Sequence, residues 1–199
     1  VCDVSRNPED FIYDRSFGRS AAETAEYVRT VVQTMTEAGM GSVLKHFPGY
    51  GNNTDTHSGV AYDGRPYETF ENEDFLPFQA GIAAGADMVL VAHNVVACMD
   101  GEKPASLSET VHNILRETLG FDGVIITDDL SMEGVQAFAS DTDIGVQAVL
   151  AGNDLLCCTD FEARIAEILD AVERGTISES RIDDSVLRIL NLKIALGIL

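Results

Sequence analysis

Asp55 and His57 are the first residues in this sequence whose types and spacing suggest a chemical role. They follow a turn that Pro48, Gly49 and Gly51 impose on the chain. A carboxylate two residues from an imidazole can accept a hydrogen bond from one ring nitrogen. That bond fixes the tautomer and leaves the other nitrogen free to transfer a proton. The pair indicates a general acid/base, and the alternative is a solvated loop that carries two unrelated polar residues.

A second candidate site is the pair Asp128 and Asp129, which follows the apolar run 124–126. Successive residues of a strand point to opposite faces, so we expect one carboxylate to face the site and Asp129 to cap or pair elsewhere. A single carboxylate combined with a separate proton donor suits double displacement at an anomeric carbon. The alternative is that Asp128 only caps a helix.

Four further side chains lie where strands or loops end. Lys45 and His46 directly precede the glycine turn, His93 follows another apolar run, and Arg15 lies in an aromatic loop. Arg15 suits a sugar hydroxyl or a carboxylate. Taken alone, the two histidines are more often core residues bonded to backbone carbonyls. His112 is predicted to lie on a helix surface.

The elements that must position these residues alternate between strand and helix. Apolar runs predict strands at 1–4, 42–44, 88–92, 124–126 and 153–158. Helices are predicted at 20–38, 71–84, 108–119, 143–150, 160–174 and 178–196, the first of them opened by a capping box of Ser20 and Glu23. Strands buried on both faces and alternating with helices indicate a parallel α/β sheet. The candidate residues follow its strands, at the end where active sites of parallel sheets lie.

Five strands leave two architectures open for one domain over residues 1–199. A complete (β/α)₈ TIM barrel needs eight strands and about 250 residues. The chain is therefore either a five-stranded open sheet of flavodoxin type or a barrel with only about five of its eight strands present. No glycine-rich dinucleotide or P-loop motif occurs, so nucleotide binding has no support.

The composition excludes some classes of binding partner. Asp and Glu number 33 against 13 Lys and Arg, a formal charge of −20, which argues against nucleic acid and against an anionic membrane surface. No apolar run is long enough to span a membrane, and the first residues do not resemble a signal peptide, so a cytoplasmic protein is expected.

The four cysteines, Cys2, Cys98, Cys157 and Cys158, lack the paired spacing of a zinc site. We expect buried free thiols, as in a reducing compartment, and no metal.

Several motifs together resemble family 3 glycoside hydrolases, in particular the β-N-acetylglucosaminidase branch. They are KHFPGYG, then DTH, then ITDDLSMEG, supported by VCDV, YDRSFG, VAHN, PASLS and LGFDGVIITDDL. The resemblance extends over nearly the whole chain, and the D-x-H pair separates the hexosaminidase branch from the β-glucosidases.

The resemblance implies a retaining glycosidase that needs no cofactor or metal and releases terminal β-linked N-acetylglucosamine from small glycans such as cell-wall fragments. Asp128 matches the nucleophile, His57 the acid/base and Asp55 its dyad partner. The residues matched to sugar binding are Arg15, Lys45, His46 and His93. A phosphorylase acting on the same linkage and a β-glucosidase remain alternatives, as does a non-catalytic assembly module.

Two departures from the family pattern stand out. Tyr50 occupies a position where many members have His, and a small effect is expected. The family barrel also has three strand–helix units before the one that matches 1–4, and the third carries an acidic side chain that grips the sugar. Nothing here matches them. We therefore expect exposed sheet edges and a possible homo-oligomer formed through them.

Overall fold

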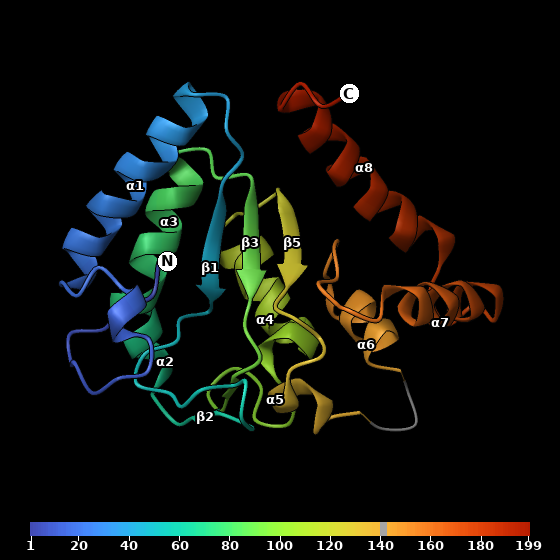
Figure 1. Cartoon of the computed structure of the whole chain (residues 1–199), viewed down its shortest axis with the longest axis horizontal. Helices are drawn as coiled ribbons and strands as arrows, with labels where there is room; N and C mark the ends of the chain where they lie inside the picture. The colour runs from blue at the N-terminus through green and yellow to red at the C-terminus, as the bar shows by residue number, and fades with distance from the viewer. Residues whose placement is uncertain (140–142) are drawn as a thin grey trace.

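The computed structural model describes residues 1–139 and 143–199 and has a parallel sheet at its centre (Figure 1). The sheet contains β1 (Val43–Phe47), β3 (Met88–Val91) and β5 (Val124–Thr127), in that order, and both pairings are parallel. Two short strands, β2 (Tyr62–Asp63) and β4 (Val95–Val96), form a second parallel pair in the loops that follow β1 and β3. The predicted α/β class with parallel strands is confirmed, whereas the pair β2–β4 was not foreseen.

The two outer segments predicted as strands contact the sheet through backbone hydrogen bonds, which beside β5 include Leu155 N–H to the Ile125 carbonyl at 3.0 Å and Thr127 N–H to the Leu155 carbonyl at 3.2 Å. Beside β1, the Cys2 amide donates to the Lys45 carbonyl at 2.6 Å. Beside β5, Leu155 forms one parallel bridge with Ile126. Neither segment forms a continuous ladder, so their prediction as full strands is wrong. The five segments nevertheless lie side by side in chain order. That order lacks the reversal of a flavodoxin-type sheet and is the order of a partial barrel.

Helices follow the strands close to the predicted bounds. They are α1 (Ala21–Glu37), α2 (Tyr67–Thr69), α3 (Phe75–Ala83), α4 (Glu109–Asn113), α5 (Glu133–Gln136), α6 (Ile144–Ala151), α7 (Phe161–Glu173) and α8 (Glu179–Ala195). Two 3-10 helices are η1 (Tyr13–Arg15) and η3 (Ala105–Leu107), and two π-helical segments are η2 (Phe70–Asp74) and η4 (Ile114–Thr118). The Ser20–Glu23 capping box opens α1 as predicted, and Ser108 caps α4 through the Val111 amide.

The main core lies on one face of the sheet. Leu44, Phe47, Val89 and Ile125 pack there with side chains of α1, α3 and α4, which cover this face in Figure 1. On the other face Val43 is 46% exposed and Met88 and Leu90 are half-buried, whereas Val124 of β5 is 1% exposed. The prediction that the strands are buried on both faces is therefore wrong for β1 and β3.

The helices α7 and α8 also carry uncovered apolar side chains, including Phe161, Leu169, Leu187 and Ile194. These residues and the open sheet face fit the expected exposed edges. Association of copies through them stays a prediction. Within the described ranges, no helix is long and apolar enough to cross a membrane.

Two predictions of burial are corrected. His112 is 2% exposed, because α4 packs against α6 and the His112 Nδ1–H donates to the Ser108 carbonyl at 2.8 Å. Of the four free cysteines, Cys2 is buried, Cys158 is half-buried, and Cys98 and Cys157 are exposed. Burial raises the pKa of the Cys2 thiol to about 12, so that sulfur stays protonated and unreactive.

Candidate active site

The candidate residues lie where the three sheet strands end. The loop after β1 carries Asp55 and His57, Asp128 directly follows β5, and His93 comes shortly after β3. Because parallel strands end at the same edge, these segments share one side of the molecule, as Figure 1 shows at the strand arrowheads. This is the edge at which parallel barrels carry their active sites.

Asp55 and His57 are in direct contact. The carboxylate oxygen Oδ1 of Asp55 lies 2.6 Å from His57 Nδ1 and also accepts the His57 backbone N–H at 2.9 Å. Partial burial acts to raise the pKa of Asp55. The two bonds from His57 and the nearby charges of His57 and Arg15 outweigh it, so that the pKa falls. The carboxylate therefore stays ionised and holds Nδ1–H, while Nε2 faces solvent on a side chain that is 61% exposed.

A backbone hydrogen bond joins this loop to the segment after β5. The amide of Gly134, at the start of α5, donates to the Thr56 carbonyl at 3.1 Å. A side chain at position 134 would collide with the carbonyls of Thr56 and Gly59, so only glycine allows this approach. The structure thus brings the Asp55–His57 pair next to the segment that carries Asp128.

Asp128 and its neighbour differ in their contacts, as the sequence predicted. Among the residues that the structure describes, Asp128 Oδ1 accepts only the Asp129 amide, at 2.9 Å, and its carboxylate is partly exposed. Asp129 Oδ1 accepts both the amide and the hydroxyl of Ser131 and so caps the following turn. Asp128 is the carboxylate that keeps an oxygen available to a ligand.

His93 lies beneath these aspartates and is fully buried. Its Nε2–H donates to the Asp129 carbonyl at 3.0 Å, and its Nδ1 accepts the Ser106 hydroxyl at 2.7 Å. Burial lowers the pKa of His93 and keeps the ring neutral, although the Asp129 carbonyl and the charges of Asp128 and Asp129 act in the opposite direction. With both nitrogens occupied, His93 has no free atom for a sugar. The expectation of a sugar contact is therefore corrected to support of the Asp128–Asp129 turn.

The remaining predicted residues lie on β1 and in η1. Lys45 is half-buried on the open face of β1, and Arg15 is exposed in η1, near enough to influence the pKa of Asp55. His46 is 3% exposed, and its Nδ1 lies 2.8 Å from Asp3 Oδ2. Only His46 Nε2 is left for a ligand.

Asp3 anchors the loop from the neighbouring N-terminal segment. Its carboxylate is buried and accepts the His46 amide at 3.2 Å as well as the Tyr50 amide at 2.8 Å. The sequence placed Asp3 at a strand end but did not reveal this anchoring contact.

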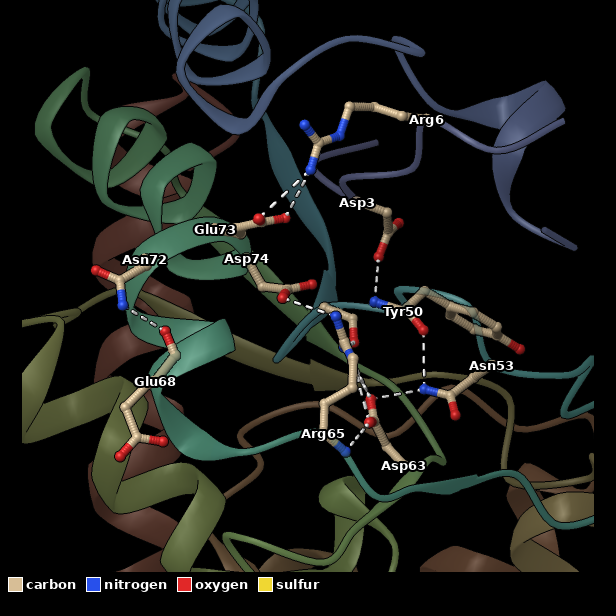
Figure 2. Close-up of polar contacts among 11 residues, drawn as sticks. Asp3, Arg6, Tyr50, Asn53, Asp63, Arg65, Glu68, Asn72, Glu73 and Asp74 are labelled. Carbon is tan, nitrogen blue, oxygen red and sulfur yellow. Dashed lines mark hydrogen bonds and ion pairs between the residues drawn. The ribbon is translucent and has the colours of Figure 1, made fainter.

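A buried charged cluster supports the turn from the other side (Figure 2). Arg65 donates to both oxygens of Asp63, to Asp74 Oδ2 at 2.9 Å and to the Gly49 carbonyl at 3.3 Å. Burial acts to lower the pKa of Arg65, but the bonds and charges of Asp63 and Asp74 raise it overall. Asn53 Nδ2 links the cluster to the turn by donating to Asp63 and to the Tyr50 carbonyl.

Sequence reasoning missed this cluster. The spacing Asp63–Arg65 and the helical Asp74 carry no motif. The folded structure shows that they act together, because the half-buried Arg65 pairs with two buried carboxylates. Within residues 1–139 and 143–199, no group of three or more His, Cys, Asp or Glu side chains is arranged to hold a metal ion.

Fold and site define a parallel α/β protein of barrel type with its polar residues at the carboxyl ends of the strands. Residues 1–192 match the model of the glycosyl hydrolase family 3 N terminal domain, so the chain belongs to that family.

Two relatives of known sequence carry the name "Beta-hexosaminidase". The chain is 40% identical over 181 residues to a "Beta-hexosaminidase" of Xanthomonas campestris pv. campestris (strain B100), a match that covers 89% of this chain and 54% of that protein. It is 44% identical over 126 residues to a "Beta-hexosaminidase" of Xylella fastidiosa (strain M12), covering 63% of this chain and 38% of the relative. The chain thus spans about half or less of the length of these relatives.

A solved structure agrees in fold. A glycoside hydrolase family 3 beta-N-acetylglucosaminidase from Paenibacillus sp. str. FPU-7 superposes with a TM-score of 0.92 at 36% identity, covering 99% of this chain and 39% of that one.

Proposed function

We propose that the protein is a retaining β-N-acetylglucosaminidase in which Asp128 is the nucleophile and His57, paired with Asp55, is the acid/base. The observation that carries the proposal is the hydrogen bond from Gly134 to Thr56, which holds the dyad beside the segment that follows Asp128. The hexosaminidase names of the relatives support the choice of sugar.

The first chemical step forms a glycosyl-enzyme. An Asp128 oxygen attacks the anomeric carbon while the bond from that carbon to the leaving oxygen breaks. His57 enters this step as imidazolium, with Nδ1–H bonded to Asp55, and gives its Nε2 proton to the leaving oxygen. The bond to Asp55 orients the ring for this transfer.

The second step reverses these roles. The neutral His57 accepts a proton from water at Nε2, and the resulting hydroxyl attacks the anomeric carbon. The bond to Asp128 breaks and its carboxylate is restored. Two inversions at one carbon give net retention of configuration.

Charged side chains around the dyad suit sugar hydroxyls and the acetamido carbonyl. We assign sugar binding to Lys45, Arg15 and the free Nε2 of His46, because Lys45 and Arg15 keep donors, and His46 Nε2 keeps an acceptor, that the described residues do not occupy. His93 acts through the Asp128–Asp129 turn.

The proposal is tested by assaying the purified chain with a nitrophenyl β-N-acetylglucosaminide. Hydrolysis should occur and should fall at least about 10³-fold in Asp128→Asn. Activity that survives Asp128→Asn contradicts the mechanism. Rate stimulation by phosphate with release of sugar 1-phosphate indicates a phosphorylase instead, and preference for the matching glucoside indicates a β-glucosidase. An inactive, folded chain favours an assembly module.

A further inference from the structure

Tyr50 lies inside the turn that leads to the dyad and is 3% exposed. Its hydroxyl contacts the backbone on both sides of Asp55. The hydroxyl donates to the Thr54 carbonyl at 3.1 Å and accepts the Thr56 amide at 3.0 Å. The Thr56 hydroxyl lies 3.1 Å away as a further donor. A phenol has one hydrogen to donate and two lone pairs, so these three contacts use its full capacity.

Hydrogen bonds also fix the backbone of Tyr50. Its amide donates to Asp3 and its carbonyl accepts Asn53 Nδ2, as Figure 2 shows. The ring packs edge-on against His46, with centroids 5.6 Å apart, and lies 5.6 Å from the ring of Phe11. The Tyr50 side chain is thus a rigid link between the end of β1 and the loop that carries Asp55 and His57.

The dyad depends on this link because its own side chains have little packing. His57 is 61% exposed, and its contact to Asp55 is local along the chain. Two groups outside segment 54–57 meet it at Thr56: the Gly134 amide donates to the Thr56 carbonyl, and the Tyr50 hydroxyl accepts the Thr56 amide. Burial raises the pKa of Tyr50, so its hydroxyl remains a donor across the working range.

We propose that Tyr50 is a positioning residue, whose hydroxyl holds Asp55 and His57 in the place from which His57 gives its proton to the leaving oxygen. This inference rests on the proposed function. It replaces the expectation that tyrosine at this position has a small effect, because the side chain makes three polar contacts at the dyad.

The test is Tyr50→Phe, which removes the hydroxyl and keeps the ring and both backbone bonds. Tyr62→Phe is the matched control, since Tyr62 is 69% exposed. The substrates are two β-N-acetylglucosaminides, one with a dinitrophenyl leaving group and one with a methyl group. A misplaced acid should lower kcat for the methyl glycoside by about 10- to 100-fold, with a change of less than about 3-fold for the dinitrophenyl glycoside and little change in KM.

Thr56→Val removes only one of the three contacts and should give a smaller loss in the same direction. Equal losses on both substrates, or losses matched by Tyr62→Phe, would overturn the positioning role. If wild-type activity does not depend on His57, the proposed function fails instead. A readout independent of activity is the NMR spectrum of the His57 ring nitrogens. Tyr50→Phe should shift or broaden these signals relative to Tyr62→Phe. Unchanged signals would count against the positioning role of Tyr50.

Discussion

The carbonyl oxygen of Thr56 accepts a hydrogen bond from the amide of Gly134 at 3.1 Å. Thr56 lies between the two members of the dyad, and Gly134 lies six residues after Asp128. One backbone contact therefore joins the loops of two strands that are not neighbours in the sheet, since β3 lies between β1 and β5. This contact supports the proposal that the acid/base and the nucleophile belong to one site.

Replacing Asp55 with Asn tests the electrostatic part of the dyad. The amide keeps the size of the side chain but removes the charge that stabilises the His57 imidazolium. We expect kcat to fall by about 10²- to 10⁴-fold for substrates with poor leaving groups. Rates measured across pH check this, with the exposed Asp122→Asn as control. A loss below about 3-fold would mean that Asp55 has no part in proton transfer.

Asp3→Asn tests the anchor at the strand end. Asn has one side-chain acceptor oxygen, whereas Asp3 accepts three hydrogen bonds from His46 and Tyr50. At least one buried donor would lose its partner, and the free energy of unfolding should fall by about 1–3 kcal/mol. Urea denaturation measures the change, and Asp14→Asn at an exposed position is the control. Unaltered stability would show that the buried carboxylate is not an anchor.

Gly49→Ala tests the close approach of the turn to the charged cluster. Gly49 has φ +128°, and an added Cβ would overlap the Asp74 carboxylate. Strain and collision together should destabilise the fold by more than about 2 kcal/mol. Gly64→Ala is the control, because a Cβ there meets nothing within 4 Å. Equal thermal denaturation midpoints for Gly49→Ala and Gly64→Ala would contradict this expectation.

The burial of Asp74 leads us to expect that the free energy of unfolding depends on pH. Burial raises its pKa to about 7, the charges of Asp3 and Asp63 add to this, and Arg65 opposes it. Its Oδ1 is buried and has no hydrogen-bond partner among the described residues, which disfavours the charged form. In the unfolded chain an aspartate has a pKa of about 3.9. Between these values the folded state binds the proton more tightly, so this contribution to stability is largest below about pH 4 and is lost as the pH rises toward about 7.

The measurement is the free energy of unfolding of wild type and Asp74→Asn at pH 5 and pH 8. Asn cannot titrate, so the difference isolates the carboxyl group. Relative to the variant, wild type should be more stable at pH 5 than at pH 8. A difference that increases toward pH 8 would show that Asp74 is stabilised as a carboxylate by Arg65.

The sequence was informative where the signal is local. Apolar runs predicted the three sheet strands, the Ser20–Glu23 capping box predicted the start of α1, and the D-x-H spacing predicted a contact that the structure has at 2.6 Å. Each of these features depends on residues within a few positions of one another.

Contacts between distant residues were not predictable in this way. Asp3 reaches His46 across 43 positions, and Arg65 joins the turn to a helix. His93 was expected to contact sugar, but its role depends on Ser106 and the Asp129 carbonyl. Periodicity reports which residues are buried, whereas it does not identify the polar partners that meet them in the folded chain.

The central claim is that Asp128 forms a covalent bond to the sugar. The direct measurement is mass spectrometry of the protein after incubation with a 5-fluoro-β-N-acetylglucosaminyl fluoride, whose fluorine at C5 slows breakdown of the glycosyl-enzyme. The account predicts one added sugar per chain, located by peptide mapping on Asp128 and absent in Asp128→Asn. A label on another residue, or turnover of this compound to a product of inverted configuration without a label, would contradict it.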